Sequence, residues 1–245
     1  MNQLVHIDDF RSALQHYRLS DAAKATLADL RLVLLVGPTS SGKNTVINEL
    51  LKLGTYHYIV SDTTRKPRVN DGVLEQNGKE YWFRTEEDML DEISKGNFLE
   101  AALIHNQQVS GTSIRELDIA RKTNRVALAE VEIAGAGSTY IAKPDTIIIF
   151  NVPPNFDIWM RRLEGRGVMP KDEFRRRLTT ACDEFEAALT HDYYHFVVND
   201  NIANTVAIID DMAQRSEFDH AKEHQAREMV KELYRQTKDY LLVTS

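Results

Sequence analysis

Cysteine is almost absent from this sequence. Cys182 is the single one among 245 residues, which excludes an intramolecular disulfide and a metal site built from several cysteines. Long apolar runs are lacking too, since no stretch approaches the ~20 residues of a membrane span. The first 30 residues also lack a basic start followed by an apolar segment. These absences predict a cytoplasmic protein with no membrane segment.

Excess positive charge is also missing. The formal net charge is -7 and the pI is about 5.6, which argues against a surface that binds nucleic acid by bulk electrostatics. Local charge differs, because seven cations gather in one short segment: Arg161, Arg162, Arg166, Lys171, Arg175, Arg176 and Arg177. Such a cluster suits a small polyanion. The alternative is a solvated helix face.

Apolar segments alternate between strand and helix patterns. A 42% hydrophobic content is enough for a sizeable core. Strands alternating with helices predict an α/β fold with a mainly parallel sheet that helices cover on both faces. The expected strands are 32–36, 57–61, 126–132, 146–152 and 195–198, and the expected helices include 156–163 and 174–189.

Three further segments complete the expected organisation. Residues 1–30 predict two short helices, the second capped by Ser20, which we interpret as an appendage. The polar, glycine-containing segment between Thr63 and Ser113 predicts turns between short strands, as in an inserted subdomain. After Arg215, apolar residues recur at helical spacing and predict a long amphipathic helix. Its apolar stripe could pack on the body of the protein or on a partner.

The most specific motif follows the first strand. It matches the phosphate-loop pattern G-x-x-x-x-G-K-[ST] except at its last position, where Asn44 replaces the hydroxyl residue. Glycines let backbone N–H groups turn toward phosphate oxygens, and the helix N-terminus and Lys43 add positive charge. The motif predicts that a nucleotide phosphate binds at Gly37, Pro38, Thr39, Ser40, Ser41, Gly42, Lys43, Asn44 and Thr45.

Several motifs follow this loop in a fixed order. They are the segment 61–68 (SDTTRKPR), Glu80-Tyr81-Trp82-Phe83, Gly96-Asn97-Phe98-Leu99-Glu100, Gly111-Thr112-Ser113, Glu130-Val131-Glu132 with Gly135, the arginines of 162–178, and Asn199-Asp200. With them, residues 32–212 resemble the guanylate kinase family. The resemblance implies a P-loop NTPase-type parallel sheet with an inserted acceptor-binding subdomain and a helical lid.

The resemblance also implies an acceptor site for a guanine nucleoside monophosphate. Arg65, Arg68 and Tyr81 correspond to the family's phosphate-binding residues, and two arginines three positions apart can form a fork on one phosphate. Ser61, Glu100 and Thr112 correspond to residues that contact the base. A carboxylate that needs the N1–H and amino group of guanine rejects AMP. The family's tyrosine before Gly-Thr-Ser is replaced by Ser110.

The remaining motifs correspond to the ATP side. Lys43 is the loop lysine, and Arg162, Arg166 and Arg177 fall where the family has lid and catalytic arginines. Asn199 corresponds to the asparagine that borders the ATP adenine. Two carboxylates alternate along the end of the expected strand 126–132, which puts both on one face. There we assign Glu132 to the nucleoside, and Glu130 with Asn44 to Mg²⁺.

We therefore expect an ATP-dependent kinase that phosphorylates GMP or dGMP. Its expected parts are a helical extension over 1–30, a kinase-like domain over 31–215 with an acceptor subdomain at 61–116 and a lid at 161–178, and a helix over 216–245. The terminal helices could form a homodimer. Two alternatives stay open: a catalytically inactive domain that binds partner peptides, and a related kinase with another acceptor.

Overall fold

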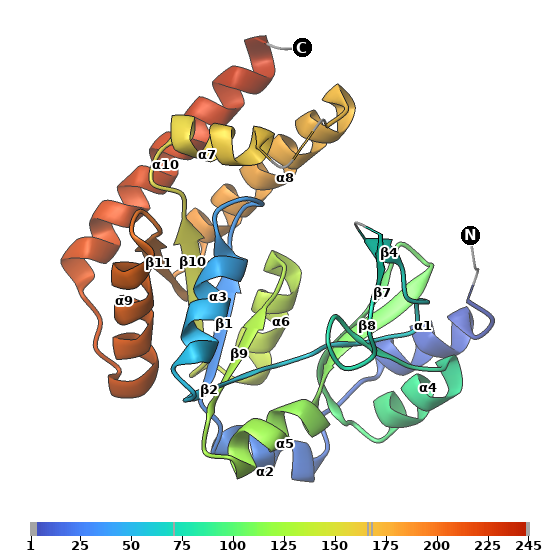
Figure 1. The fold of residues 1–245 in the computed structure, drawn as a ribbon. Helices are drawn as coiled ribbons and strands as arrows, with labels where there is room; N and C mark the ends of the chain where they lie inside the picture. Colours follow the sequence, from blue (N-terminus) through green and yellow to red (C-terminus); the bar gives the residue numbers. More distant parts are fainter. Residues whose placement is uncertain (1–3, 71, 166, 168, 244–245) are drawn as a thin grey trace. The chain divides into compact units, whose positions relative to one another are not determined.

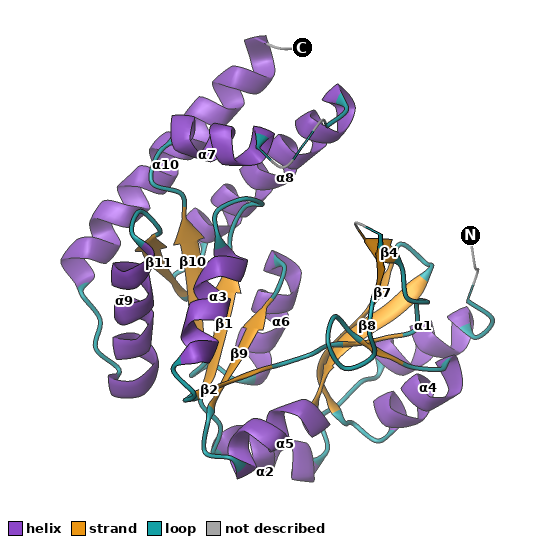
Figure 2. Cartoon of the chain, viewed as in Figure 1, coloured by secondary structure: helices purple, strands orange, loops and turns teal. Residues whose placement is uncertain are grey.

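The computed structural model describes residues 4–70, 72–165, 167 and 169–243. They form two compact units (Figure 1). The first contains residues 1–31, 57–129 and 141–144, and the second contains 32–56, 130–140 and 145–245. Figure 2 shows that strands and helices occur in both units.

A parallel sheet organises the second unit. Strand β10 (Ile147–Val152) lies between β1 (Leu32–Val36) and β11 (Tyr194–Val198) and pairs in parallel with both. Every residue of β1 is apolar and buried, as expected for a strand covered on both faces. The full sheet order is β11-β10-β1-β9-β2, which adds β2 (Tyr56–Tyr58) and β9 (Val126–Glu130).

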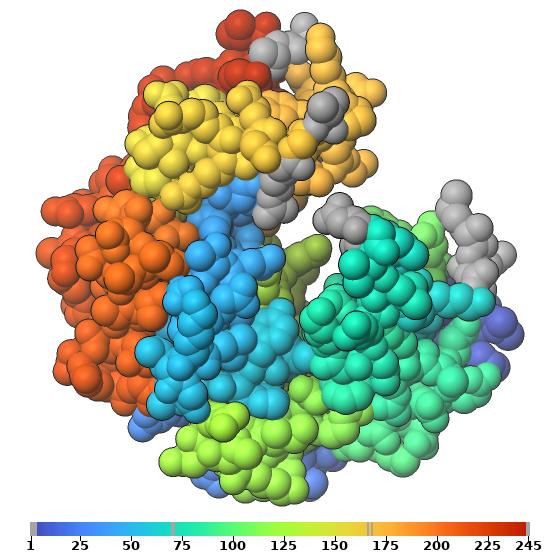
Figure 3. Space-filling model, in the orientation of Figure 1, coloured from blue at the N-terminus to red at the C-terminus, as the bar shows by residue number. Residues whose placement is uncertain are grey.

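Helices carry most of the remaining sequence of the second unit. Asn155 and Asn201 cap two of them, by accepting hydrogen bonds from Ile158 N–H and Asn204 N–H. Helix α3 packs against α9, as the blue and orange atoms of Figure 3 show. The helices are α3 (Lys43–Lys52), α6 (Ile133–Ala142, which ends in the first unit), α7 (Phe156–Glu164), α8 (Lys171–Thr190), α9 (Ile202–Arg215) and α10 (His220–Val243).

The predicted C-terminal helix is confirmed as α10. Its buried residues include Ala226, Val230 and Leu233, and the helix packs against α8 and β11. Of the two possibilities for its apolar stripe, the structure shows packing on the body of the unit.

The first unit is built on a second sheet. Its strands follow the order β6-β3-β8-β7, with β7 (Phe98–Ile104) and β8 (Gln108–Ser113) antiparallel. The polar segment predicted to form turns between short strands does so: it contains β3 (Asp62–Thr63), β6 (Trp82–Phe83) and a small hairpin of β4 (Val69–Asn70) and β5 (Val73–Leu74). Helices α4 (Glu86–Ser94) and α5 (Ile114–Lys122) complete the unit.

Both predicted N-terminal helices form, but α1 is no appendage. They are α1 (Ile7–Gln15) and α2 (Asp21–Ala28), and Ser20 Oγ caps α2 by accepting from Ala23 N–H at 3.1 Å. Phe10 of α1 is fully buried in a hydrophobic cluster with residues of α4, β7 and β8, namely Met89, Ile93, Phe98 and Val109. The first helix therefore supplies part of the core of the first unit.

Two strand predictions differ from the structure. The segment expected as one strand at 57–61 divides into the end of β2 and a connection that leads to β3. The strand expected over 126–132 ends at Glu130, so Glu132 lies outside it, directly before α6. Strand alternation therefore does not place Glu130 and Glu132 on one face, because β9 ends at Glu130 and Glu132 belongs to the connection before α6.

Candidate active site

The phosphate loop connects β1 to α3 in the second unit. Its backbone has positive φ at Gly37 (135°), Ser40 (63°) and Gly42 (97°). A Cβ on Gly37 would lie 2.8 Å from Asn151 O, and one on Gly42 would collide with Asn199 Nδ2. Glycine is therefore required at both positions, for its conformation and for its lack of a side chain. The first turn of α3, whose N–H groups have no acceptor within the helix itself, starts at Lys43.

Two side-chain amides donate hydrogen bonds to the backbone of this loop. Asn151 at the end of β10 and Asn199 after β11 both donate to Ser41 O, each at 2.9 Å. Trp159 of α7, which is fully buried, donates from Nε1 to Thr39 O at 2.9 Å. The sequence interpretation missed Asn151 and Trp159, because each acts on the loop from more than 100 residues away.

The side chain of Lys43 folds back onto the backbone at the start of the loop. Its Nζ donates to Gly37 O at 2.5 Å and to Pro38 O at 3.2 Å, and it lies 3.4 Å from Glu130 Oε1. Asn44 and Thr45 are exposed on the first turn of α3. The structure thus brings together the predicted loop lysine and the predicted metal carboxylate, whereas Glu132 is exposed beyond the strand.

The cation cluster divides between two helices. On α7, Arg162 donates to Ser41 O and to Asn199 O, both at 3.5 Å. On α8, Arg177 lines a cavity of about 110 Å³ together with Thr39 of the loop, Arg176, Thr180 and Glu184. Arg177 also donates from Nε to Glu173 at 2.8 Å. Arg166 lies outside the described residues.

Glu184 is an ionisable residue of this site that the sequence interpretation missed. Burial raises the pKa of its carboxyl to about 7, opposed by the charge of Lys43 and reinforced by Glu132, Glu130 and Asp183. Its spacing of seven positions from Arg177 puts both on one face of α8, which is the signal that could have revealed it.

The predicted phosphate-binding arginines lie in the first unit. Arg65 forms a two-point ion pair with Glu75, at 2.5 and 2.8 Å, and its guanidinium carbon lies 4.7 Å from the ring centre of Tyr81. Glu75 also accepts from Arg68 N–H at 2.9 Å. Both partners of the ion pair are largely buried, with side-chain exposures of 11% for Arg65 and 6% for Glu75. Glu75 thus fixes the segment that carries both arginines.

The predicted base-contacting residues occupy β7 and β8. Thr112 Oγ1 donates to Glu100 Oε1 at 2.9 Å, and desolvation raises the pKa of Glu100. Ser110, which replaces the expected tyrosine, uses its hydroxyl for a 2.8 Å hydrogen bond with Thr63. Ser61 is partly buried just before β3, and its carbonyl accepts from Trp82 N–H at 2.9 Å.

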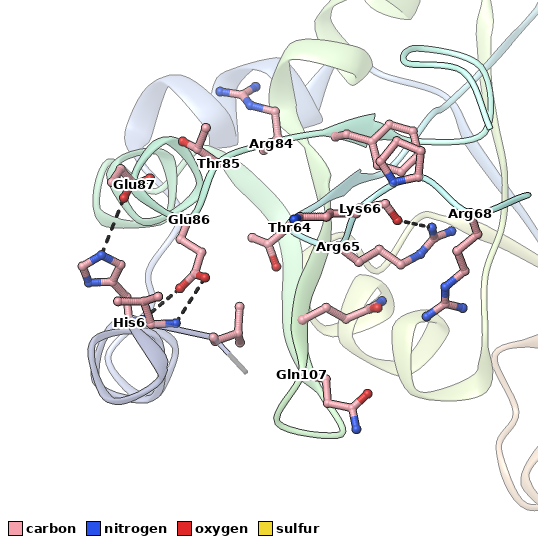
Figure 4. Close-up of a pocket in the computed structure, with 15 residues that line it drawn as sticks. His6, Thr64, Arg65, Lys66, Arg68, Arg84, Thr85, Glu86, Glu87 and Gln107 are labelled. Atoms are coloured by element: carbon pink, nitrogen blue, oxygen red, sulfur yellow. Dashed lines mark hydrogen bonds and ion pairs between the residues drawn. The ribbon is translucent and has the colours of Figure 1, made fainter. Parts of the chain in front are cut away.

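The first unit contains a pocket of about 1070 Å³ (Figure 4). Arg65 and Arg68 line it, together with residues of the N-terminal segment and of the β7–β8 turn, among them His6 and Gln107. Ser61, Tyr81, Glu100 and Thr112 are not part of its lining. The pocket therefore contains only part of the predicted acceptor site.

The described residues contain no cluster of three or more His, Cys, Asp or Glu side chains that could hold a metal ion. Among the helices of these same residues, none has the length and hydropathy needed to cross a membrane.

The loop contains glycines and joins a buried parallel strand to a helix, and Lys43 and two side-chain amides hydrogen-bond to its backbone. This arrangement is typical of P-loop proteins of the α/β class. Comparison with known proteins is more specific. The family model described as guanylate kinase matches residues 29–216. The chain belongs to the guanylate kinase family and is a nucleoside monophosphate kinase, which favours the enzyme over the alternative of an inactive peptide-binding domain.

Individual relatives agree with this assignment. The chain is 37% identical over 184 residues to a guanylate kinase of Corynebacterium glutamicum, covering 74% of this chain and 94% of that one. It is also 37% identical over 181 residues to a guanylate kinase of Corynebacterium diphtheriae, covering 73% and 92%. Among solved structures, guanylate kinase from Anaplasma phagocytophilum matches with a TM-score of 0.54 and 26% identity, covering 78% and 87%.

Proposed function

We propose that the protein transfers a phosphoryl group from ATP to GMP or dGMP and that the acceptor is selected at Glu100. The observation that carries this proposal is the Glu100–Thr112 pair on β7 and β8 of a guanylate kinase family member. A desolvated carboxylate gains most from the N1–H and amino donors of guanine, and adenine has an acceptor at N1 instead.

On the acceptor side, Arg65, Arg68 and Tyr81 bind the monophosphate. The Glu75 contacts support this role, because a guanidinium held by a two-point ion pair is already oriented before the phosphate arrives. Ser61 and Thr112 contact the base beside Glu100, and Glu132 contacts the nucleoside. These residues belong to the acceptor subdomain, 61–116, except for Glu132.

On the ATP side, the loop residues 37–45 bind the phosphates. Among the described residues, Ser40 Oγ is a buried polar atom without a hydrogen-bond partner, which supports a polar ligand at the loop. Lys43, Arg162 and Arg177 supply positive charge for the migrating group, together with Arg166, and Asn199 borders the adenine. The residues from 161 to 178 serve as the lid.

Mg²⁺ fits the donors of the second unit. This ion is usually bound by one or two protein groups together with phosphates and waters, so a site with few protein ligands suits it. Glu130 and Asn44 would hold it through a carboxylate and an amide oxygen. When bound, Mg²⁺ neutralises charge on the nucleotide phosphates. Lys43 Nζ lies 3.4 Å from Glu130 Oε1, so the lysine and the carboxylate are already side by side where the nucleotide phosphates and the ion would meet.

The substrates are small molecules, and we propose that the protein works in the cytoplasm without nucleic acid. The net charge of -7 supports the latter point, because phosphate backbones repel an acidic surface. A homodimer through the terminal helices stays a prediction. The apolar stripe of α10 packs within its own unit, so a dimer would have to use other surfaces of these helices.

The test is ADP production from ATP with GMP, dGMP, AMP, CMP and UMP in turn. GMP or dGMP should be used at least about a hundredfold more efficiently than AMP. No turnover with any acceptor would contradict the kinase proposal. Turnover without preference for guanine would contradict the role of Glu100.

A further inference from the structure

Tyr17 joins the N-terminal segment to the strand that carries Glu100. It follows α1, and its hydroxyl accepts a hydrogen bond from Phe98 N–H at 2.8 Å and donates one to Phe98 O. A single side chain therefore satisfies both backbone groups of Phe98, two residues before Glu100 on β7.

Strand β7 is irregular at this point. Phe98 pairs with Ser113 and Glu100 pairs with Thr112, so the register shifts by one residue at Leu99. Phe98 packs in the hydrophobic cluster beside Ala101 and Leu103, although strict alternation would put an even-numbered residue on the other face. The shift lets Phe98 enter the core while Glu100 meets Thr112. A bulge of this kind aims a side chain but leaves backbone groups to be paired elsewhere.

Further contacts hold the N-terminal segment against α4 and against the turn before β7. Ser20 N–H donates to Gly96 O at 3.1 Å, and a Cβ on Gly96 would collide with Arg18 O. The carboxylate of Glu86 accepts from Val5 N–H at 3.2 Å and His6 N–H at 2.9 Å (Figure 4). With Phe10 in the core, these contacts fix the Tyr17 hydroxyl relative to β7.

We propose that Tyr17 is a positioning residue for Glu100, so that the N-terminal segment 4–20 is part of the apparatus that recognises the acceptor base. This inference rests on the proposed function of Glu100. The segment precedes residues 29–216, which the family model matches. Tyr17 would therefore position Glu100 from outside the part of the chain that the family shares.

The electrostatics agree with this role. Burial raises the pKa of Tyr17 and outweighs the opposing effect of the hydrogen bond with the Phe98 backbone, and the charge of Glu100 adds to the rise. The hydroxyl therefore stays protonated and keeps donating to Phe98 O. Loss of the hydroxyl would leave two polar groups of the bulge unpaired, which favours rearrangement of the backbone that aims Glu100.

The test is Tyr17→Phe in the full chain, which keeps the ring in the hydrophobic cluster. The KM for GMP should rise about threefold to tenfold, because only part of the free energy of the two lost hydrogen bonds reaches the acceptor site through Glu100. The preference for GMP over AMP should fall by a similar factor, with kcat and the KM for ATP unchanged. A matched control is Tyr56→Phe, which removes a hydroxyl bonded to Asp210 at 2.8 Å in the second unit.

A purely structural role would lower Tm in both variants and leave the KM for GMP unchanged in both. That result would overturn the positioning role. Glu100→Ala separates this failure from failure of the proposed function. If Glu100→Ala loses guanine selectivity and Tyr17→Phe keeps it, only the inference about Tyr17 is wrong. If Glu100→Ala also keeps selectivity, the acceptor assignment itself is wrong.

Discussion

Asn44 provides an amide where phosphate loops of this pattern usually have a hydroxyl that ligates Mg²⁺. It is exposed on the first turn of α3, in the same unit as Glu130. We expect Asn44→Ser to lower several-fold the Mg²⁺ concentration that gives half-maximal activity, because the shorter hydroxyl restores the usual ligand. The measurement is a Mg²⁺ titration of ADP production at saturating nucleotide.

The matched control is Asn48→Ser, one turn further along α3 and also exposed. It should leave the titration unchanged. Identical Mg²⁺ curves for Asn44→Ser and the unmodified protein would show that the ion does not depend on this position.

Glu184 gives a pH-dependent stability whose sign can be stated. Its pKa is raised from 4.5 to about 7, so between these values the folded state holds a proton that the unfolded state has lost. The free energy of unfolding contributed by this group therefore falls as pH rises from about 5 to 7. Glu184→Gln has no carboxyl to ionise and so avoids this fall in the free energy of unfolding. At pH 8 the nucleotide-free variant should be more stable than the unmodified protein by about 2–3 kcal/mol.

Urea denaturation at pH 5.5 and pH 8 checks this expectation. The exposed Glu186→Gln on the same helix is the control and should show no pH-dependent difference. Equal stability of Glu184→Gln and the unmodified protein at both pH values would contradict the raised pKa. The charged groups whose fields act on Glu184 are Lys43, Glu130, Glu132 and Asp183, so all variants should retain them.

At the scale of elements, α8 presents different arginines to different neighbours. Arg177 shares a cavity with Thr39 of the phosphate loop, whereas Arg175 donates to Leu241 O of α10 at 3.2 Å. An arginine that acts mainly in the transition state lowers kcat when removed but leaves nucleotide binding intact. Arg177→Ala should therefore reduce kcat by about a thousandfold or more, with the Kd for ATP nearly unchanged.

Calorimetry and steady-state kinetics measure the two quantities, and Arg175→Ala is the control that should keep most of its turnover. For Arg166 we predict the same loss of kcat from its place in the family pattern. Near-normal turnover of Arg177→Ala would show that this arginine belongs to a solvated helix face.

Helix α10 lies beyond the residues that the family model matches, yet its inner face is buried. Leu233 is 1% exposed, while Leu242 near the end of the same helix is 74% exposed. Leu233→Ala should lower the free energy of unfolding by about 2–5 kcal/mol, because it opens a cavity in the core. Leu242→Ala should change it by less than about 0.5 kcal/mol. Urea denaturation tests both, and equal effects would contradict the packing of α10.

At the scale of the molecule, the parts predicted best are those that local sequence determines. The buried strand 32–36, the glycines of the loop and the apolar spacing of 46–51 each limit the local backbone, so β1, the loop and α3 lie where the sequence places them. The same holds for α10, whose helical spacing extends over its length. Ser20 likewise indicates the start of α2, because a cap acts within three residues.

Contacts between distant segments were not predictable in this way. Tyr17 and Phe98 are 81 residues apart, and no periodicity links them. Glu75 is one acidic residue in a polar turn region, and its pairing with Arg65 depends on how that turn folds. The end of β9 at Glu130 was missed because Val131, whose N–H still donates to Leu35 O of β1 at 3.2 Å, continues the pattern of the strand by one residue.

The proposal that Glu100 selects a guanine acceptor is tested by the ratio of kcat/KM for GMP to that for AMP. We would measure it with the unmodified protein, with Glu100→Ala, and with Asp88→Ala as an exposed carboxylate control in the same unit. We expect a ratio of at least about one hundred for the unmodified protein and for Asp88→Ala, falling to near unity for Glu100→Ala. A ratio that Glu100→Ala leaves unchanged would contradict the role of Glu100.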